Sequence, residues 1–210
     1  KRGRALTKQT GTFILLKKVR YGESDLIVTG ISAAGEKKSF LARSALKSRK
    51  RFGGGVLEPL HHVRLSYSDK ANKQQLSVLE EAQLLNDFAS LKKDYDVLQF
   101  GLFAVECITK VSQEGDSLSD SLYNLLGHCL KNLSTENLNY QIHLPILKVQ
   151  FFLKLLAEQG VLEQEPWMIP FLSTPLTQFT TLEPVAIEAR NQSTRVEKIV
   201  REYLAHAHLS

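Results

Sequence analysis

Five short segments with the pattern of β-strands lie within the first 80 residues of this 210-residue chain, and turn residues separate them. A flat antiparallel sheet of so few short strands would expose two unpaired edges, whereas a closed barrel exposes none. We therefore predict a small five-stranded barrel at this end of the chain. Its expected strands are Thr12–Val19, Leu26–Ser32, Lys37–Ala42, Leu60–Tyr67 and Gln75–Leu79.

From about residue 81 the apolar residues recur every three or four positions, which is the period of amphipathic helices. The predicted helices run from Phe88 to near Gly115, from Ser117 to Leu133, from Leu144 to Gly160 with Pro145 in the first turn, and from Thr194 onward. Four of the six prolines fall in 164–192, which we expect to be a packed irregular connection. The fold class is therefore α+β, with a barrel domain over 1–80 and a helical domain over 81–210.

The net charge changes sign at the same boundary. Residues 1–80 hold 17 Lys and Arg against 6 Asp and Glu, whereas residues 81–210 hold 10 against 16. The modest total of +5 therefore hides a basic barrel joined to an acidic helical part. Such a barrel suits phosphates, and the helical part suits protein partners.

The chain carries no convincing catalytic or metal-binding pattern. Asp94 and Asp96 form an Asp-x-Asp pair, but residues two apart on a helix point away from each other. Cys107 and Cys129 are too few for a cysteine zinc site, and we expect both in the core. No phosphate-binding glycine loop or nucleophile elbow occurs. We therefore predict a non-enzymatic protein with no cofactor and no metal.

Charged residues also argue against a membrane protein. Lys or Glu interrupts each apolar stretch well before the length that a membrane span requires, and no signal segment opens the sequence. We expect a cytoplasmic protein that does not bind membranes. Because the chain begins at Lys1 rather than at a methionine, we expect further residues to precede it.

A dense run of cations lies between the third and fourth expected strands. Ser44–Gly55 carries four cations within five positions and then three glycines, and both features make burial costly, so we predict a mobile basic loop. More cations border the first and third strands, with Tyr21, Phe40, Phe52 and Tyr67 interleaved. Cations bind phosphates and aromatic rings stack on bases, so the combination predicts nucleic-acid binding. The alternative is that the cations only make the domain soluble and that Phe40 and Tyr67 belong to its core. The candidate contacts are Lys17, Lys18, Arg20, Lys37, Lys38, Arg43, Lys47, Arg49, Lys50 and Arg51.

A series of short motifs follows the first expected strand. Tyr-Gly-Glu-Ser-Asp occupies Tyr21–Asp25, hairpin residues occupy Gly35–Lys37, and Ala42-Arg43 precedes the basic run Lys47–Arg51. This series resembles the N-terminal segment of the bacterial RecO recombination-mediator family. The similarity continues more weakly through 144–162 and the closing helix, and so covers most of the chain.

The resemblance implies an OB-fold followed by a helical domain, without catalytic turnover. It also implies a nucleoid-associated protein that binds single-stranded and double-stranded DNA, anneals complementary strands, engages the C-terminal tail of the single-stranded-DNA-binding protein, and works with RecR to load RecA. Many members of the family carry a four-cysteine zinc module after the third large helix. Because 164–192 contains no cysteine, we predict no zinc site here.

In the family the tail of the single-stranded-DNA-binding protein is acidic and ends in an apolar residue, so its site requires a cation beside an apolar groove. The candidates are Lys148, Phe152 and Lys154, which share one predicted helix; the alternative is that this face is bundle core with two lysines at its rim. Two other functions stay open. A basic barrel also suits an RNA-binding or ribosome-associated adaptor, and acidic helix residues would suit a metal-dependent nuclease.

Overall fold

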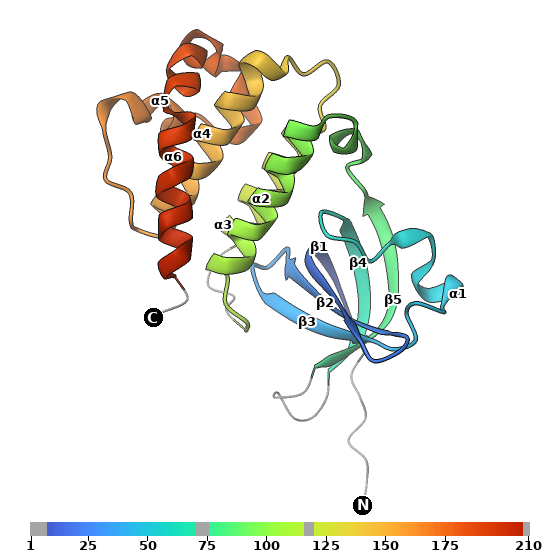
Figure 1. Ribbon diagram of the computed structural model, residues 1–210. Coiled ribbons are helices and arrows are strands. Elements are labelled where there is room, and N and C mark those ends of the chain that lie inside the picture. Colours follow the sequence, from blue (N-terminus) through green and yellow to red (C-terminus); the bar gives the residue numbers. More distant parts are fainter. Residues whose placement is uncertain (1–7, 70–75, 116–119, 208–210) are drawn as a thin grey trace, which may run out of the picture. The chain divides into compact units, whose positions relative to one another are not determined.

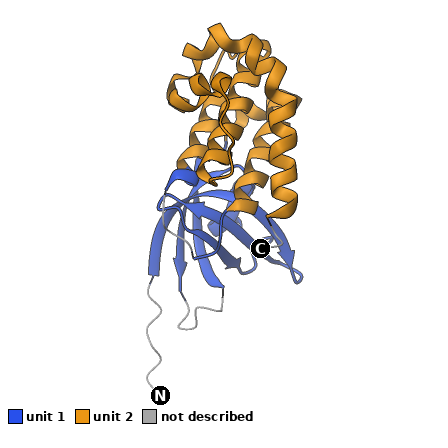
Figure 2. Cartoon of the chain, turned by 90° about the vertical axis from the view of Figure 1, so that its left-hand side faces the viewer, with its two compact units in different colours: residues 1–87, 112–123 blue, residues 88–111, 124–210 orange. Residues whose placement is uncertain are grey.

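The computed structural model describes residues 8–69, 76–115 and 120–207 (Figure 1). The chain divides into two compact units, which Figure 2 distinguishes by colour. Unit 1 takes in residues up to 87 together with 112–123, and unit 2 takes in 88–111 and the residues from 124 onward.

Unit 1 is a closed five-stranded barrel. Its strands are β1 (Lys8–Tyr21), β2 (Asp25–Ser32), β3 (Lys37–Ala42), β4 (His62–Ser68) and β5 (Ser77–Asn86), arranged in the order β1-β2-β3-β5-β4. Paired strands are antiparallel except β3 and β5, which run parallel. This arrangement is an OB-fold. The predicted OB-fold barrel followed by a helical domain is therefore confirmed.

Three aromatic rings fill the middle of the barrel. Phe13, Phe40 and Tyr67 meet edge to face, with ring centroids 5.2, 6.1 and 4.9 Å apart. The period-two alternation of β-strands directs all three inward, and edge-to-face contact suits the charge distribution of the rings. Phe52 belongs to the same buried cluster. Phe40 and Tyr67 are therefore core residues, as the alternative interpretation predicts, and Phe52 joins them, so none of the three rings is available to stack on bases.

The last strand runs further than the sequence pattern predicts. β5 ends at Asn86 rather than Leu79, so the domain boundary expected at residue 80 falls inside the strand. Most side chains of 80–86 are exposed, and no apolar alternation marks this stretch. Backbone pairing with β4 extends the strand instead, from Ser68 opposite Val78 to His62 opposite Asn86.

The segment Ser44–Gly55, here called the basic turn, is ordered rather than a mobile loop. It contains the short helix α1 (Arg49–Phe52), which Ser48 caps by accepting a hydrogen bond from the amide of Arg51, and the 3-10 turn η1 (Gly53–Gly55). The prediction of a mobile loop is wrong because Ala45 and Phe52 pack into the barrel core and anchor the turn. Its cations remain on the surface together with Leu46, while Ala45 and Phe52 are buried.

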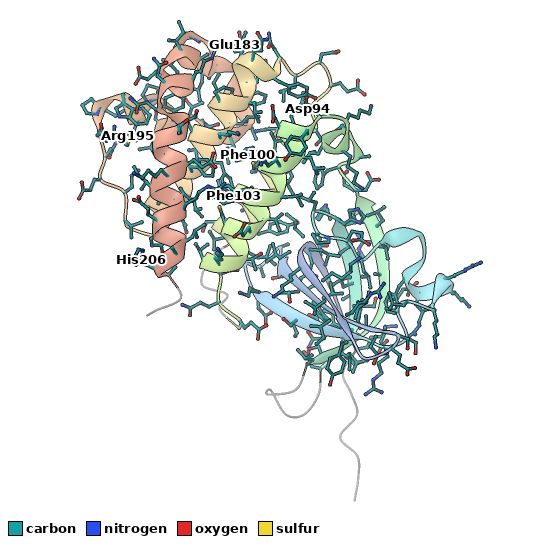
Figure 3. The ribbon with its side chains drawn as sticks, in the orientation of Figure 1. Asp94, Phe100, Phe103, Glu183, Arg195 and His206 are labelled. Carbon is teal, nitrogen blue, oxygen red and sulfur yellow. The ribbon has the colours of Figure 1, made fainter. Side chains whose placement is uncertain are left out.

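Unit 2 is helical. Its elements are η2 (Ala89–Lys93), α2 (Tyr95–Val111), α3 (Ser121–Leu133, whose first three residues count with unit 1), α4 (Tyr140–Glu158), η3 (Pro166–Met168), α5 (Ile169–Ser173), η4 (Leu176–Val185) and α6 (Ala186–His206). Phe100 and Phe103 extend from α2 (Figure 3), and they meet Phe151 and Phe152 of α4 with centroids 5.6 to 5.9 Å apart. This aromatic cluster joins α2 to α4.

Several helices begin at other residues than predicted. α2 starts at Tyr95 rather than Phe88, because Phe88 has a left-handed backbone and the Asp94 carboxylate accepts the amide hydrogen bond of Val97. The predicted start at Ser117 lies outside the described residues. α6 begins at Ala186, well before Thr194, and the expected irregular connection 164–192 contains η3, α5 and η4 as well. A proline-rich stretch without a clear period concealed these short helical turns.

α4 begins four residues before the predicted start, at an N-cap formed by Asn139. Pro145 therefore lies inside the helix rather than in its first turn. Proline has no amide hydrogen, so it cannot donate to the carbonyl oxygen four residues earlier, on Gln141. The Arg190 guanidinium of α6 donates to that oxygen at 2.9 Å. The interruption in one helix thus becomes an attachment point for another.

Side-chain donors hold the short elements that follow α4. The carbonyl oxygens of Leu172, Thr174 and Leu176 accept hydrogen bonds from Lys154 at 2.7 Å, Gln150 at 2.8 Å and Asn132 at 2.7 Å, respectively. A short helix leaves its last carbonyls without partners in its own backbone. Donors from α3 and α4 supply these partners here, so the segment is fixed by tertiary hydrogen bonds.

Cys107 of α2 and Cys129 of α3 are buried free thiols. Burial raises the pKa of both, that of Cys107 to about 12, so neither ionises at neutral pH. Among the helices in the described ranges, none combines the length and apolar character needed to cross a bilayer.

Candidate nucleic-acid interface

The tip of the β1–β2 hairpin holds the basic turn in place. The Asp25 carboxylate accepts a hydrogen bond from the Ser44 amide at 2.7 Å, and the Leu46 amide donates to the Ser24 carbonyl at 3.0 Å. Gly22 supplies the left-handed conformation, with φ of 64°, that lets the hairpin reverse so tightly. β1 and the basic turn therefore present their cations from one connected scaffold.

Arg51 stabilises the turn from within. Its guanidinium donates to the Arg43 carbonyl at 2.9 Å and to the Ser48 hydroxyl at 3.3 Å, and it lies 5.0 Å from the centre of the Phe52 ring. The group stays exposed, so it can still offer positive charge to a phosphate. Its geometry is set before any ligand arrives, which lowers the entropic cost of binding.

Seven of the ten predicted cations are exposed and form no ion pair with another described residue. They are Lys17, Arg20, Arg43, Lys47, Arg49, Lys50 and Arg51. The hairpin and turn, 17–25 and 43–58, contain eight cations but three carboxylates. Exposed cations without internal partners lose little when they meet a phosphate, so this surface suits a polyanion.

The structure places the other three predicted cations in internal contacts. Lys18 pairs with Glu58, and Lys38 pairs with Asp69 at 2.8 Å while lying 4.6 Å from the centre of the Tyr67 ring. Lys37 is half-buried, donates to the Ser112 carbonyl at 2.8 Å, and has a pKa lowered mainly by burial. The sequence shows the positive charge of these three residues, but it does not show their partners, which lie 31 to 75 positions away in the chain.

Unit 2 contains a groove of about 470 Å³ between α4 and α6. Its lining comprises Tyr140, Gln141, Leu144, Pro145, Lys148, Arg190 and Ser193. Of the three residues predicted to bind a partner, Lys148 lines this groove and lies 5.8 Å from the centre of the Phe100 ring. Phe152 is fully buried, and Lys154 is tied to the Leu172 carbonyl, with a pKa lowered by burial.

Arg190 is a groove residue that the sequence analysis missed. It lies 42 positions after Lys148, in a region without a clear helical period. The available signal was Pro145, because a proline inside a helix leaves a carbonyl oxygen in need of a donor. Together, Lys148 and Arg190 place two cations beside the apolar side chains of Leu144 and Pro145.

Comparison with known proteins identifies the family to which this barrel is similar. Residues 7–88, which span the whole barrel, match the family model described as Recombination protein O N terminal. A protein of Desulfatibacillum aliphaticivorans is 30% identical over 152 residues, which is 72% of this chain and 57% of that protein. The chain belongs to the RecO family. The family predicted from the hairpin motifs is therefore confirmed.

Other RecO relatives support the same assignment. Proteins of Syntrophus aciditrophicus and Koribacter versatilis are 37% identical over 108 residues and 42% identical over 82 residues. The first alignment covers 51% of this chain and 40% of the relative, and the second covers 39% and 33%. Each of the three relatives bears the name DNA repair protein RecO. The chain spans about half the length of the curated relatives that it matches.

The RecO match contains all ten predicted DNA contacts, whereas the α4–α6 groove lies beyond residue 88. In the described ranges, no three His, Cys, Asp or Glu side chains gather as metal ligands. His61 and His62 bond to different partners, the Val56 carbonyl and the Tyr123 hydroxyl. The Asp94 carboxylate caps α2. These residues therefore have structural roles in the barrel or at a helix start.

Proposed function

We propose that this chain acts in DNA repair and recombination as a mediator that binds single-stranded and double-stranded DNA through unit 1. The observation that carries the proposal is the set of seven exposed cations around the hairpin tip and basic turn that form no ion pair with another described residue. The RecO relatives are named DNA repair proteins, which supports a role in DNA repair, and the positive charge of unit 1 supports a nucleic acid as its ligand.

Phosphate contacts of this kind position a strand without reading its sequence. Lysine and arginine side chains displace the counterions that surround the phosphates, and the released counterions drive binding. Two strands that approach each other repel through their phosphates. A surface that neutralises both lowers that barrier, so strand annealing follows from the same cations, without a catalytic group.

Unit 2 supplies the proposed docking surface for proteins. The α4–α6 groove combines the Lys148 and Arg190 cations with the apolar sides of Leu144 and Pro145. This chemistry suits the acidic, apolar-ended tail of the single-stranded-DNA-binding protein. Binding of that protein by the same chain would bring coated DNA to the DNA-binding cations and, together with RecR, would help RecA to load.

The proposal is tested by annealing complementary strands that are already coated with the single-stranded-DNA-binding protein. The test variant replaces Lys47, Arg49, Lys50 and Arg51 with alanine. The matched control removes the same charge from exposed positions of unit 2, at Lys92, Lys93, Lys131 and Lys198. We expect the unmodified chain and the control to anneal at similar rates and the test variant to be strongly impaired. Equal rates for all three proteins would refute the proposal, as would failure of the unmodified chain to bind DNA.

The same preparations separate the alternatives. Comparing matched DNA and RNA strands tests an RNA adaptor, which would bind RNA more tightly. Incubation of labelled DNA with Mg²⁺ or Mn²⁺ tests a nuclease, and we expect the DNA to stay intact.

A further inference from the structure

Unit 2 carries exposed apolar side chains where the connection after α4 turns back along α6 (Figure 1). Two side-chain contacts fix the path of this connection. The Tyr203 hydroxyl donates to the Gln159 side chain at 3.2 Å, and the Arg195 guanidinium pairs with Glu165 at 2.6 Å. Residues 195, 199 and 203 lie on one face of α6, so Ile199 faces the middle of the connection.

The middle of the connection is apolar and accessible. Val161 is 46% exposed, Ile199 is 37% exposed, and Leu162 is partly exposed. These three residues are here called the α6 patch. The Val161 amide donates to the Leu156 carbonyl at 3.1 Å, the bond that closes a Schellman turn at the end of α4. The connection therefore leaves α4 in a defined direction, and the patch is part of the folded surface.

Carboxylates outnumber cations around the α6 patch. Residues 158–165 and 195–203, which contain it, hold five carboxylates against three cations. Each of these cations forms an ion pair with a carboxylate of the same set: Arg195 with Glu165, Lys198 with Glu202, and Arg201 with Glu197. The patch therefore carries net negative charge, which repels DNA and acidic peptides and attracts a basic surface.

The basic turn of unit 1 is complementary to this patch. Leu46 is 47% exposed, and the cations Lys47, Arg49 and Lys50 next to it are exposed as well. The turn thus presents an apolar side chain among cations, whereas the α6 patch presents apolar side chains among carboxylates. Surfaces that match in both charge and apolar character favour association.

We propose that the basic turn of one copy of the chain docks on the α6 patch of a second copy, with Leu46 against Val161 and Ile199. Opposite charges attract and orient the two copies, and the apolar contact stabilises the docked state. This inference goes beyond the proposed function, because the ligand of the α6 patch is the chain itself. DNA and a second copy compete for the same cations of the basic turn.

The size and character of the two surfaces predict how the copies associate. One turn against one patch buries a small area, and small interfaces form weak, transient complexes. Because the two surfaces differ, each docked copy keeps its other surface for a further copy until a ring closes. We therefore expect association that increases with protein concentration and weakens as salt screens the charges.

The test removes each surface in a separate variant. The basic-turn variant replaces Lys47, Arg49, Lys50 and Arg51 with alanine and keeps the α6 patch. It can offer a patch but no turn, so it should not associate with itself. It should still accept the intact basic turn of another chain.

The patch variant carries Glu163→Lys and Ile199→Lys and keeps the basic turn. Lysine retains the helix preference at position 199 while it removes the apolar contact and reverses the local charge. The matched control carries Glu136→Lys and Ile187→Lys, which change the same residue types at exposed positions elsewhere on unit 2. Thermal unfolding verifies that all variants fold.

Sedimentation velocity measures association at about 50 mM salt, where screening is weak, and at about 10 to 500 µM protein, a range suited to weak complexes. We expect the unmodified chain and the matched control to associate, and each single-surface variant to associate at least about tenfold more weakly. A mixture of the basic-turn variant and the patch variant contains one intact turn and one intact patch. It should therefore form a complex that neither variant forms alone.

Three results would overturn the inference. An unmodified chain that stays monomeric throughout would assign the α6 patch to a different basic protein. Equal losses in the patch variant and its matched control would indicate general charge attraction rather than docking. A mixture of the two single-surface variants that stays monomeric would show that the turn and the patch do not bind each other.

DNA binding by the same proteins separates this inference from the proposed function. The patch variant and its matched control carry the same added charge and should bind DNA equally well. If the mixed variants form a complex but the unmodified chain binds no DNA, the proposed function fails and the docking stands. If the unmodified chain binds DNA but remains monomeric, the docking fails and the proposed function stands.

Discussion

The salt dependence of single-strand binding reports how many cations contact phosphates. Each phosphate neutralised on a single strand contributes about −0.7 to the slope of log affinity against log salt. The seven exposed cations, which form no ion pair within the described part of the chain, therefore set a slope of about −5 if all of them engage. Raising the salt from about 50 to 200 mM would then weaken binding about 1,000-fold.

Replacing Lys47, Arg49, Lys50 and Arg51 with alanine leaves three of these cations. The slope should fall to about −2, and the same salt change should weaken binding about 20-fold. The control variant at Lys92, Lys93, Lys131 and Lys198 should keep the steeper slope, although its total charge is equally reduced. Anisotropy titrations at four salt concentrations measure all three slopes.

Two results would refute this reasoning. A slope near −7 for the unmodified chain would mean that Lys18, Lys37 and Lys38 also contact phosphates, contrary to their internal bonds. Identical slopes for the basic-turn variant and the unmodified chain would remove the basic turn from the interface altogether.

Three further predictions concern the two units. Phe40→Ala should destabilise the barrel by about 3–5 kcal/mol in urea unfolding, because it leaves a cavity among the aromatic rings of the core. Tyr21→Ala, at an exposed position, should cost under about 0.5 kcal/mol. Equal costs for the two variants would contradict the inward placement of Phe40. Hydrogen bonds from Arg195, labelled in Figure 3, and from Trp167 lower the pKa of Glu165 below its ordinary value of 4.5. The ionised carboxylate therefore stabilises the folded state above that pH. This contribution to the free energy of unfolding is lost as the pH falls through the lowered pKa. Unfolding curves of Glu165→Gln and the unmodified chain should therefore differ at pH 7 and converge in acid, and a constant difference would argue against the pair. Lys148→Glu should abolish the calorimetric signal for an acidic, apolar-ended peptide without affecting DNA binding. The control Lys131→Glu, on the surface of α3, should keep that signal. Loss of the signal in both variants would mean that the peptide is attracted by charge in general rather than bound in the groove.

Much of the barrel could be predicted from the sequence because strand alternation and turn residues are local signals. Alternation along β1 would place Tyr21 on the same face as Phe13, but a β-bulge between Leu15 and Lys17 shifts the register, and Tyr21 is exposed. The end of β5 was missed because pairing with β4, rather than burial, maintains it.

The candidate interface was predictable as a region more than as a set of residues. Clustered charge identified the basic turn, but pairing decides which cations stay available, and Glu58, Asp69 and Ser112 are distant in sequence. In unit 2, the apolar spacing of α4 found Lys148, but it could not distinguish the buried Phe152 from a surface residue. Arg190 belongs to the groove through a contact between two helices, which no local pattern encodes.

The three side-chain donors that hold the segment after α4 have a consequence for how that segment opens. Asn132, Gln150 and Lys154 each satisfy a different carbonyl oxygen within Leu172–Leu176, so the short turns there depend on donors from α3 and α4. Local fluctuations should then release the whole stretch together rather than residue by residue. In amide hydrogen exchange, its protected amides would share one opening free energy, and a single substitution such as Gln150→Leu would lower that value along the entire stretch.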